Sequence, residues 1–183
     1  MKELNFIALF FLTTILVSET GLYDHSVPKI EGGSQNLSIY QGKKILVITL
    51  PIQQNASADS LLYSLDTLAI AHASDFKVIA VPAYEDGYVD TMKNQLLSWY
   101  RSKLGSYILI TDGLYTRKTS GSQQHPVFKW LTHVSENGVF DVDVDAEEPG
   151  SKFFISASGK LNGVLKSKTK IWGRAVQKTL QLQ

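Results

Sequence analysis

The stretch Lys44-Ile45-Leu46-Val47-Ile48-Thr49-Leu50 decides the fold. Every residue after Lys44 is aliphatic or β-branched, which is the pattern of a central strand that is covered on both faces. Pro51 follows at once and ends the strand, because proline has no backbone N–H to donate to a sheet. The stretch therefore predicts a buried strand in an α/β domain.

Strand and helix patterns alternate after this strand. Ser57 and Asp59 are expected to cap a helix whose apolar positions fall at helical spacing, namely Leu61, Leu62, Leu65, Leu68, Ala69 and His72. The further expected elements are a strand at 76–81 stopped by Pro82, a helix at 89–102, a strand at 107–110, a helix at 126–133, hairpin strands at 152–156 and 161–165, and a helix at 171–180. This order predicts a thioredoxin-like α/β sandwich of three layers, in which helices flank a central mixed sheet. Strands 44–50 and 76–81 are expected to be adjacent and parallel.

The composition is that of one ordinary globular domain. Of the 183 residues, 44% are hydrophobic and 19% are charged, and the formal net charge is +1. The densest basic run, at 166–170, has no interleaved aromatic residues, so no nucleic-acid partner is expected. Trp99, Trp130 and Trp172 fall in helical patterns and are expected in the core. The chain contains no cysteine, so its core must hold it without disulfides.

The first 20 residues form a separate segment. Lys2 precedes an apolar run at 6–17, and small or polar residues follow at 18–21, which is the layout of a secretory signal peptide. The apolar run is shorter than the roughly 20 residues that a membrane-spanning helix needs. We therefore expect residues 1–20 to be a signal peptide and 21–183 to be the mature domain. The product is expected to be periplasmic or extracellular, with no stable membrane insertion after cleavage.

Several islands of sequence between residues 22 and 183 resemble the glutathione peroxidase family, in the family's order. They are 22–27 with Gly32-Gly33, 37–44, 76–82, 125–131, and 151–155 with Gly159-Lys160. The island at 37–44 is similar to the family's Tyr-x-Gly-Lys turn, and 151–155 is similar to its Thr-Lys-Phe-Leu-Val hairpin. The resemblance implies the thioredoxin-like fold preceded by an N-terminal β-hairpin. It also implies peroxide reduction by a cysteine or selenocysteine.

The positions that carry this activity in the family hold other residues here. With Gly42-Lys43 placed on the family's turn, Gln54 falls at the position of the peroxidatic residue, and a neutral amide is no nucleophile near neutral pH. The family's glutamine falls on Glu85 and its Trp-Asn pair on Glu148-Pro149, where a carboxylate would raise the pKa of a thiol. The resemblance thus implies a member that has lost peroxidase activity, with no catalytic residue, cofactor or metal. Its surface is expected to bind an unidentified protein or small molecule.

Two alternative functions stay open. One is a non-redox enzyme in which Gln54, Glu85 and Glu148 converge in one cleft and two carboxylates share a proton. The other is a glutathione peroxidase by descent, from a family associated with oxidative stress. In that case the activity would be assigned to the protein by family membership alone, because fold does not imply function.

Metal binding has weak support in the sequence. The run at 141–148 has the alternating acids of a calcium loop, but Ala146 and Lys152 stand where that loop has glycine and glutamate. An edge strand or solvated loop is therefore the favoured interpretation. The four histidines also lack the close spacing of zinc ligands, at positions His25, His72, His125 and His133.

Overall fold

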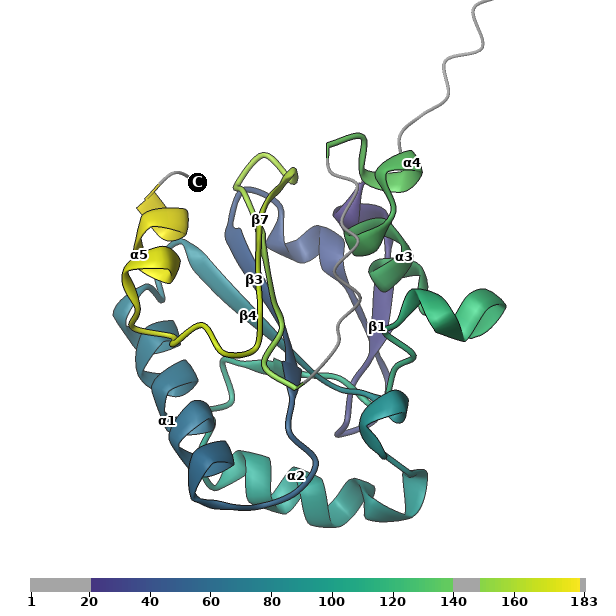
Figure 1. Cartoon of the computed structure of the whole chain (residues 1–183), viewed down its shortest axis with the longest axis vertical. Coiled ribbons are helices and arrows are strands. Elements are labelled where there is room, and N and C mark those ends of the chain that lie inside the picture. Colours follow the sequence, from purple (N-terminus) through teal and green to yellow (C-terminus); the bar gives the residue numbers. More distant parts are fainter. Residues whose placement is uncertain (1–20, 140–148, 182–183) are drawn as a thin grey trace, which may run out of the picture.

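The computed structural model describes residues 21–139 and 149–181 and shows a central sheet with helices on both sides (Figure 1). The acidic run at 141–148 and the expected signal peptide at 1–20 lie outside the described residues. The elements in chain order are η1 (Leu22–Asp24), β1 (Ser26–Pro28), β2 (Ser34–Asn36), η2 (Leu37–Tyr40), β3 (Lys44–Leu50), α1 (Ala56–Ala71), β4 (Phe76–Pro82), η3 (Tyr84–Asp86), η4 (Asp90–Met92), α2 (Lys93–Arg101), β5 (Leu109–Ile110), η5 (Lys118–Gln123), α3 (Pro126–Thr132), α4 (Val134–Asn137), β6 (Lys152–Ile155), β7 (Leu161–Leu165) and α5 (Arg174–Gln181).

The main sheet has five strands in the order β5-β4-β3-β6-β7. β3 and β4 are parallel neighbours, with Lys44 opposite Phe76 and Leu50 opposite Pro82. β5 continues the parallel part, whereas β6 and β7 add antiparallel strands on the other side of β3. The prediction of a mixed sheet with strands 44–50 and 76–81 adjacent and parallel is therefore confirmed.

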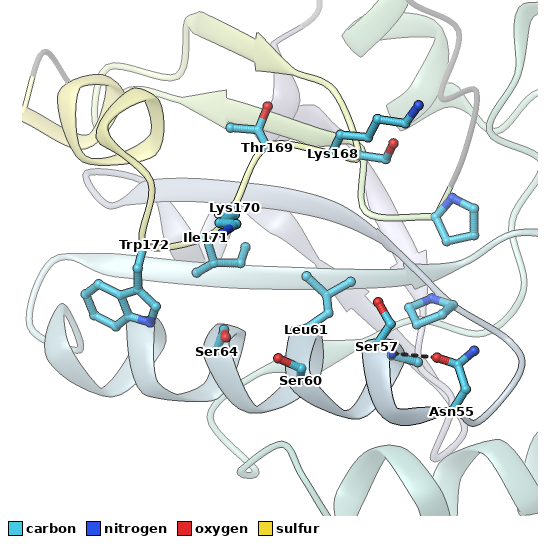
Figure 2. Close-up of a pocket in the computed structure, with 14 residues that line it drawn as sticks. Asn55, Ser57, Ser60, Leu61, Ser64, Lys168, Thr169, Lys170, Ile171 and Trp172 are labelled. Atoms are coloured by element: carbon cyan, nitrogen blue, oxygen red, sulfur yellow. Dashed lines mark hydrogen bonds between the residues drawn. The ribbon is translucent and has the colours of Figure 1, made fainter.

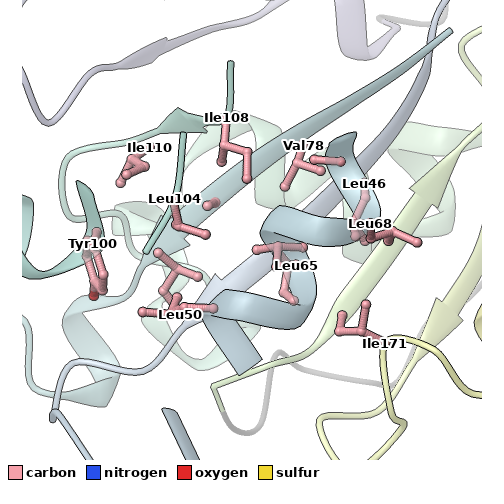
Figure 3. Close-up of a cluster of buried hydrophobic side chains, with 14 of the residues drawn as sticks. Leu46, Leu50, Leu65, Leu68, Val78, Tyr100, Leu104, Ile108, Ile110 and Ile171 are labelled. Carbon is pink, nitrogen blue, oxygen red and sulfur yellow. The ribbon is translucent and has the colours of Figure 1, made fainter. Parts of the chain in front are cut away.

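The central strand β3 is covered on both faces, as its continuous apolar sequence predicts. Leu46, Ile48 and Leu50 pack with side chains from α1, α2 and the α5 region in one buried cluster, part of which is drawn in Figure 3. Ile45 and Val47 belong to a second cluster, with side chains from α3 and the N-terminal segment. Successive side chains of a strand point to opposite faces, so β3 serves two cores and makes the domain three layers deep.

An antiparallel hairpin, β1 with β2, precedes the sheet and confirms the expected N-terminal β-hairpin. Its turn contains Gly32 and Gly33, both with positive φ, a conformation that glycine adopts without steric cost. The chain between these strands also reaches the sheet, because the backbone N–H of Ile30 donates to the carbonyl oxygen of Ile110 at 3.1 Å. The hairpin is thereby attached to the edge strand β5.

Three local predictions are wrong. The N-cap of α1 is Asn55, whose Oδ1 accepts a hydrogen bond from the backbone N–H of Ala58 at 2.9 Å, rather than Ser57 or Asp59. The last helix begins at Arg174 instead of 171. Trp172 consequently precedes that helix and is 47% exposed, whereas Trp99 and Trp130 are buried as predicted. Among the described residues, no helix has the length and apolar character needed to cross a membrane.

Candidate functional site

The segment between β3 and α1 holds the position that the family resemblance assigns to the peroxidatic residue. Gln54 lies there, two residues before the first residue of α1, and it is exposed. The hydroxyl of Tyr100 on α2 donates to the carbonyl oxygen of Pro51 at 2.8 Å, and burial raises the pKa of this tyrosine, so it remains a proton donor. Tyr100 fixes the start of the segment and the Asn55 cap fixes its end. Gln54 therefore lies on an anchored turn that faces solvent.

Gln54 has a carboxylate beside it. Asp59, in the first turn of α1, lies close enough to Gln54 for this side chain to contribute to lowering the pKa of Asp59. Trp99 Nε1 donates to Asp59 Oδ1 at 2.7 Å, and the ammonium of Lys103 lies 3.4 Å from Oδ2. The Trp99 hydrogen bond, with smaller contributions from Lys103 and Gln54, lowers the pKa of Asp59 below its ordinary value. A thiol at position 54 would therefore face an ionised carboxylate, which opposes formation of a thiolate.

The carboxylate of Glu85 binds the loop that follows β5. Its Oε1 accepts hydrogen bonds from the backbone N–H groups of Thr116 and Arg117, both at 2.8 Å, and from the Ser120 hydroxyl at 2.6 Å. The neighbouring Asp86 forms an ion pair with Arg117 at 2.6 Å. These contacts give Glu85 a structural role, because one carboxylate oxygen already satisfies three donors of the same loop.

The predicted convergence of Gln54, Glu85 and Glu148 stays a prediction. In the described part of the chain, no hydrogen bond joins Gln54 to Glu85, and the Glu85 carboxylate is bound to the loop at 116–120 instead. Glu148 lies outside the described residues. Pro149 is described, and it lies directly before the segment that leads into β6.

That segment is attached to the end of β3. The Thr49 hydroxyl accepts hydrogen bonds from the backbone N–H groups of Gly150, at 3.0 Å, and Ser151, at 3.1 Å. Gly150 has a φ of +98°, in the region that favours glycine over residues with a side chain. These contacts hold Pro149 in place next to the connection between β3 and α1.

A buried lysine lies behind the same segment. Lys152 in β6 is fully buried, and its ammonium donates to the backbone oxygens of Gly150 at 2.6 Å, Ser167 at 3.2 Å and Lys166 at 3.5 Å. Burial lowers the pKa of Lys152 to about 8. This ammonium ties the segment before β6 to the loop between β7 and α5. The strand-like sequence around Lys152 gave no signal of that role.

These two segments and α1 enclose a groove of about 650 Å³, which is shown in Figure 2. One wall is the N-terminal half of α1, and the other is the loop between β7 and α5. The lining residues are Pro51, Asn55, Ser57, Ala58, Ser60, Leu61, Ser64, Pro149, Ser167, Lys168, Thr169, Lys170, Ile171 and Trp172. Of the sequence-predicted site residues, Pro149 lines the groove, whereas Gln54 and Glu85 do not.

The lining of the groove is basic and rich in hydroxyl groups. It includes the two lysines Lys168 and Lys170 and, among the described residues, no aspartate or glutamate. The hydroxyl-bearing side chains are Ser57, Ser60, Ser64, Ser167 and Thr169. The spacing of three and four residues between the α1 serines could have revealed them in the sequence, because such positions share one helix face. The groove is therefore suited to a polar or anionic ligand.

Metal ligation has no support in the described part of the chain, where no group of three histidine, aspartate or glutamate side chains could hold an ion.

Comparison with known proteins supports the fold. No protein-family model matches the chain, and no curated protein matches it. The crystal structure of Trgpx in its apo form is similar, with a TM-score of 0.63 and 21% identity, covering 88% of this chain and 95% of that chain. T. cruzi GPX1 has a TM-score of 0.61 and 17% identity, covering 89% of this chain and 96% of its own.

A structure described as a disulfide oxidoreductase is similar as well. A secreted Mycobacterium tuberculosis disulfide oxidoreductase has a TM-score of 0.53 and 12% identity, covering 88% of this chain and 98% of that chain. At sequence identities this low, the structural similarity shows only that the fold is shared. The chain thus has a thioredoxin-like α/β fold, and it has this fold without a single cysteine.

Proposed function

We propose that this protein is an exported, glutathione-peroxidase-like protein that does not reduce peroxides and that acts by binding. The observation that carries the proposal is the position two residues before α1: Gln54 stands there, and the chain has no cysteine anywhere. Thiol peroxidases need a thiolate that passes through a sulfenic acid, and no other side chain replaces it. The names of two similar structures, Trgpx and T. cruzi GPX1, support descent from that family.

Binding through the groove beside α1 is the second part of the proposal. The volume of about 650 Å³ falls within the range of ligand sites, and the lining combines charged, hydroxyl and apolar groups. An enzyme that uses the cleft carboxylates is less well supported, because Glu85 already accepts three hydrogen bonds from its own loop.

Export is the third part. It rests on the signal-like sequence at 1–20, and it agrees with the description of one structural neighbour as a secreted protein.

Restoring a cysteine tests why the site is inactive. Gln54→Cys should give a titratable thiol but no peroxide turnover above that of Gln53→Cys, a matched variant with an exposed thiol one residue away. The reason is that Asp59 is ionised beside position 54, while Glu85 is bound to its loop and supplies no donor. The measurement is glutathione oxidation coupled to hydrogen peroxide, with metal-free protein.

The two variants separate the possible outcomes. Equal, slow rates for both cysteines are expected from our account. If Gln54→Cys reduced peroxide about a hundredfold faster than Gln53→Cys, the site would still hold the supporting groups, and our explanation of its inactivity would be wrong.

A further inference from the structure

We propose that the groove beside α1 binds an acidic oligosaccharide, one built from uronic acids. This inference rests on the proposed function, because it names the ligand class of the binding groove. Three features of the lining carry it: a row of hydroxyl groups on one wall, two lysines on the other, and an exposed indole at one end. Figure 2 shows the serines on α1 across from the loop that carries Thr169, Lys170 and Trp172.

The wall formed by α1 presents hydroxyl groups to the groove. Ser57, Ser60 and Ser64 are three and four residues apart, so they follow one face of the helix over about 10 Å. None of the three hydroxyls has a hydrogen-bond partner among the described residues. Each serine hydroxyl can both donate and accept, which matches the hydroxyl groups of a sugar. Leu61, between them, gives the floor an apolar element.

The opposite wall supplies positive charge. Lys168 and Lys170 are exposed, and neither ammonium forms an ion pair or hydrogen bond within residues 21–139 and 149–181. The described lining contains no carboxylate that would neutralise them. A ligand carboxylate would therefore gain charge-assisted hydrogen bonds that no residue within 21–139 and 149–181 uses. This charge selects a uronic acid over a neutral sugar.

Trp172 closes one end of the row with an aromatic face. It is 47% exposed, while the protein's other tryptophans, Trp99 and Trp130, are 8% and 3% exposed. The face of an indole ring is electronegative, so it attracts the weakly positive C–H groups of a pyranose ring laid against it. A half-exposed indole beside hydroxyl groups is thus a complementary surface for a sugar.

A peptide fits the groove less well. Recognition of extended peptides by strand addition needs a free sheet edge, and no lining residue belongs to a strand. The loop backbone is folded on itself, since the N–H of Thr169 donates to Lys166 and that of Gly173 donates to Lys170. The walls therefore offer side-chain hydroxyls and charges rather than a row of backbone groups.

The test uses Trp172 as a built-in reporter. The full-length protein is titrated with the trimer of galacturonic acid, and binding is followed by tryptophan fluorescence and by calorimetry. The comparison ligands are the neutral galactose trimer and tetraglutamate, an acidic peptide. We expect saturable binding of the acidic trimer with a change in Trp172 fluorescence, and at least tenfold weaker binding of the other two ligands.

Variants assign the binding to the groove. The double variant Lys168→Gln with Lys170→Gln should weaken binding of the acidic trimer at least tenfold, since it removes both charged donors. Trp172→Ala should weaken it several-fold in calorimetry. Lys160→Gln and Tyr63→Ala, which remove an exposed lysine and an exposed aromatic residue outside the lining, should leave the dissociation constant unchanged.

Each other outcome overturns the inference. Equal affinity for the neutral trimer would show that the ligand need not be acidic. Tighter binding of tetraglutamate than of the acidic trimer would show that the groove binds an acidic peptide and not a sugar. No binding of the acidic trimer, or binding that the lysine variants do not change, rejects this ligand class. These failures differ from failure of the proposed function, which would be seen as thiol-dependent peroxide reduction by the wild-type protein.

Discussion

Lys152 has a structural role that could not be predicted from the sequence around it. A fully buried ammonium normally has a carboxylate partner, but here three backbone oxygens take that place. They belong to Gly150, Lys166 and Ser167, so a single side chain holds together the two segments that border the groove. Glu85 has a corresponding role after β4, where it binds the loop at 116–120.

Lys152 should give the protein a distinctive dependence of stability on pH. Its pKa is lowered to about 8 in the folded protein, against about 10.4 when unfolded, so between these values the unfolded chain binds more protons. Stability should therefore rise with pH, by about 2 kcal/mol between pH 8 and 9.5. In Lys152→Met this rise should be much smaller, and what is left comes from Lys77, whose pKa burial also lowers. The measurement is urea unfolding of both proteins at several pH values.

Tyrosine titration sets the highest pH to which this rise in stability extends. Burial raises the pKa of Tyr84 to about 12, so above pH 10 the folded protein holds a proton that the unfolded chain loses, and stability falls. Parallel pH profiles for wild type and Lys152→Met below pH 9.5 would show that Lys152 does not titrate with a lowered pKa.

At the scale of elements, helix α1 has an N-cap that stabilises it and a side that lines the groove. Asn55 accepts the hydrogen bond of Ala58 and ends the connection from β3. The sequence pattern predicted the helix and its buried residues Leu62, Leu65, Leu68 and Ala69, whereas Leu61 and His72 of the same prediction are only partly buried. It assigned the cap to Ser57 and Asp59, because serine and aspartate are equally good caps by type. Their actual roles differ: Ser57 lines the groove, and Asp59 binds Trp99 of α2 and Lys103, which follows that helix.

The cap can be tested by a pair of substitutions. Asn55→Ala should lower the free energy of unfolding by about 1 kcal/mol, since it leaves a backbone N–H of the first turn without its acceptor. Ser57→Ala should change stability little, because the Ser57 hydroxyl has no partner among the described residues. Urea unfolding at neutral pH measures both, and an equal or larger loss for Ser57→Ala would contradict the assignment.

At the scale of the whole molecule, local sequence patterns predicted the strands but not the contacts between loops. The apolar run of β3, the proline that ends β4 and the turn between β6 and β7 indicated the strands and the parallel pair, because buried strands need continuous apolar sequence. Loop contacts were not predictable in this way. The exposure of Trp172 and the assembly of the groove depend on how the loop after β7 lies against α1, and residues more than a hundred positions apart determine it.

Export of the domain remains a prediction for the whole molecule. Protein recovered from the secreted or periplasmic fraction should begin near residue 18 to 21, since the charged, apolar and small-residue regions of a signal peptide precede that point. Mass spectrometry of the intact protein measures this directly. A secreted product that still begins at Met1 would contradict it.

The central claim is that this scaffold has lost thiol peroxidase chemistry, and turnover of hydrogen peroxide by the metal-free wild-type protein tests it most directly. Glutathione and thioredoxin are supplied in separate assays as reductants. Our account predicts a rate equal to that of a control without protein, because neither an attacking nor a resolving thiol exists in the chain. Reductant-dependent turnover above that control, in proportion to protein concentration, would contradict it.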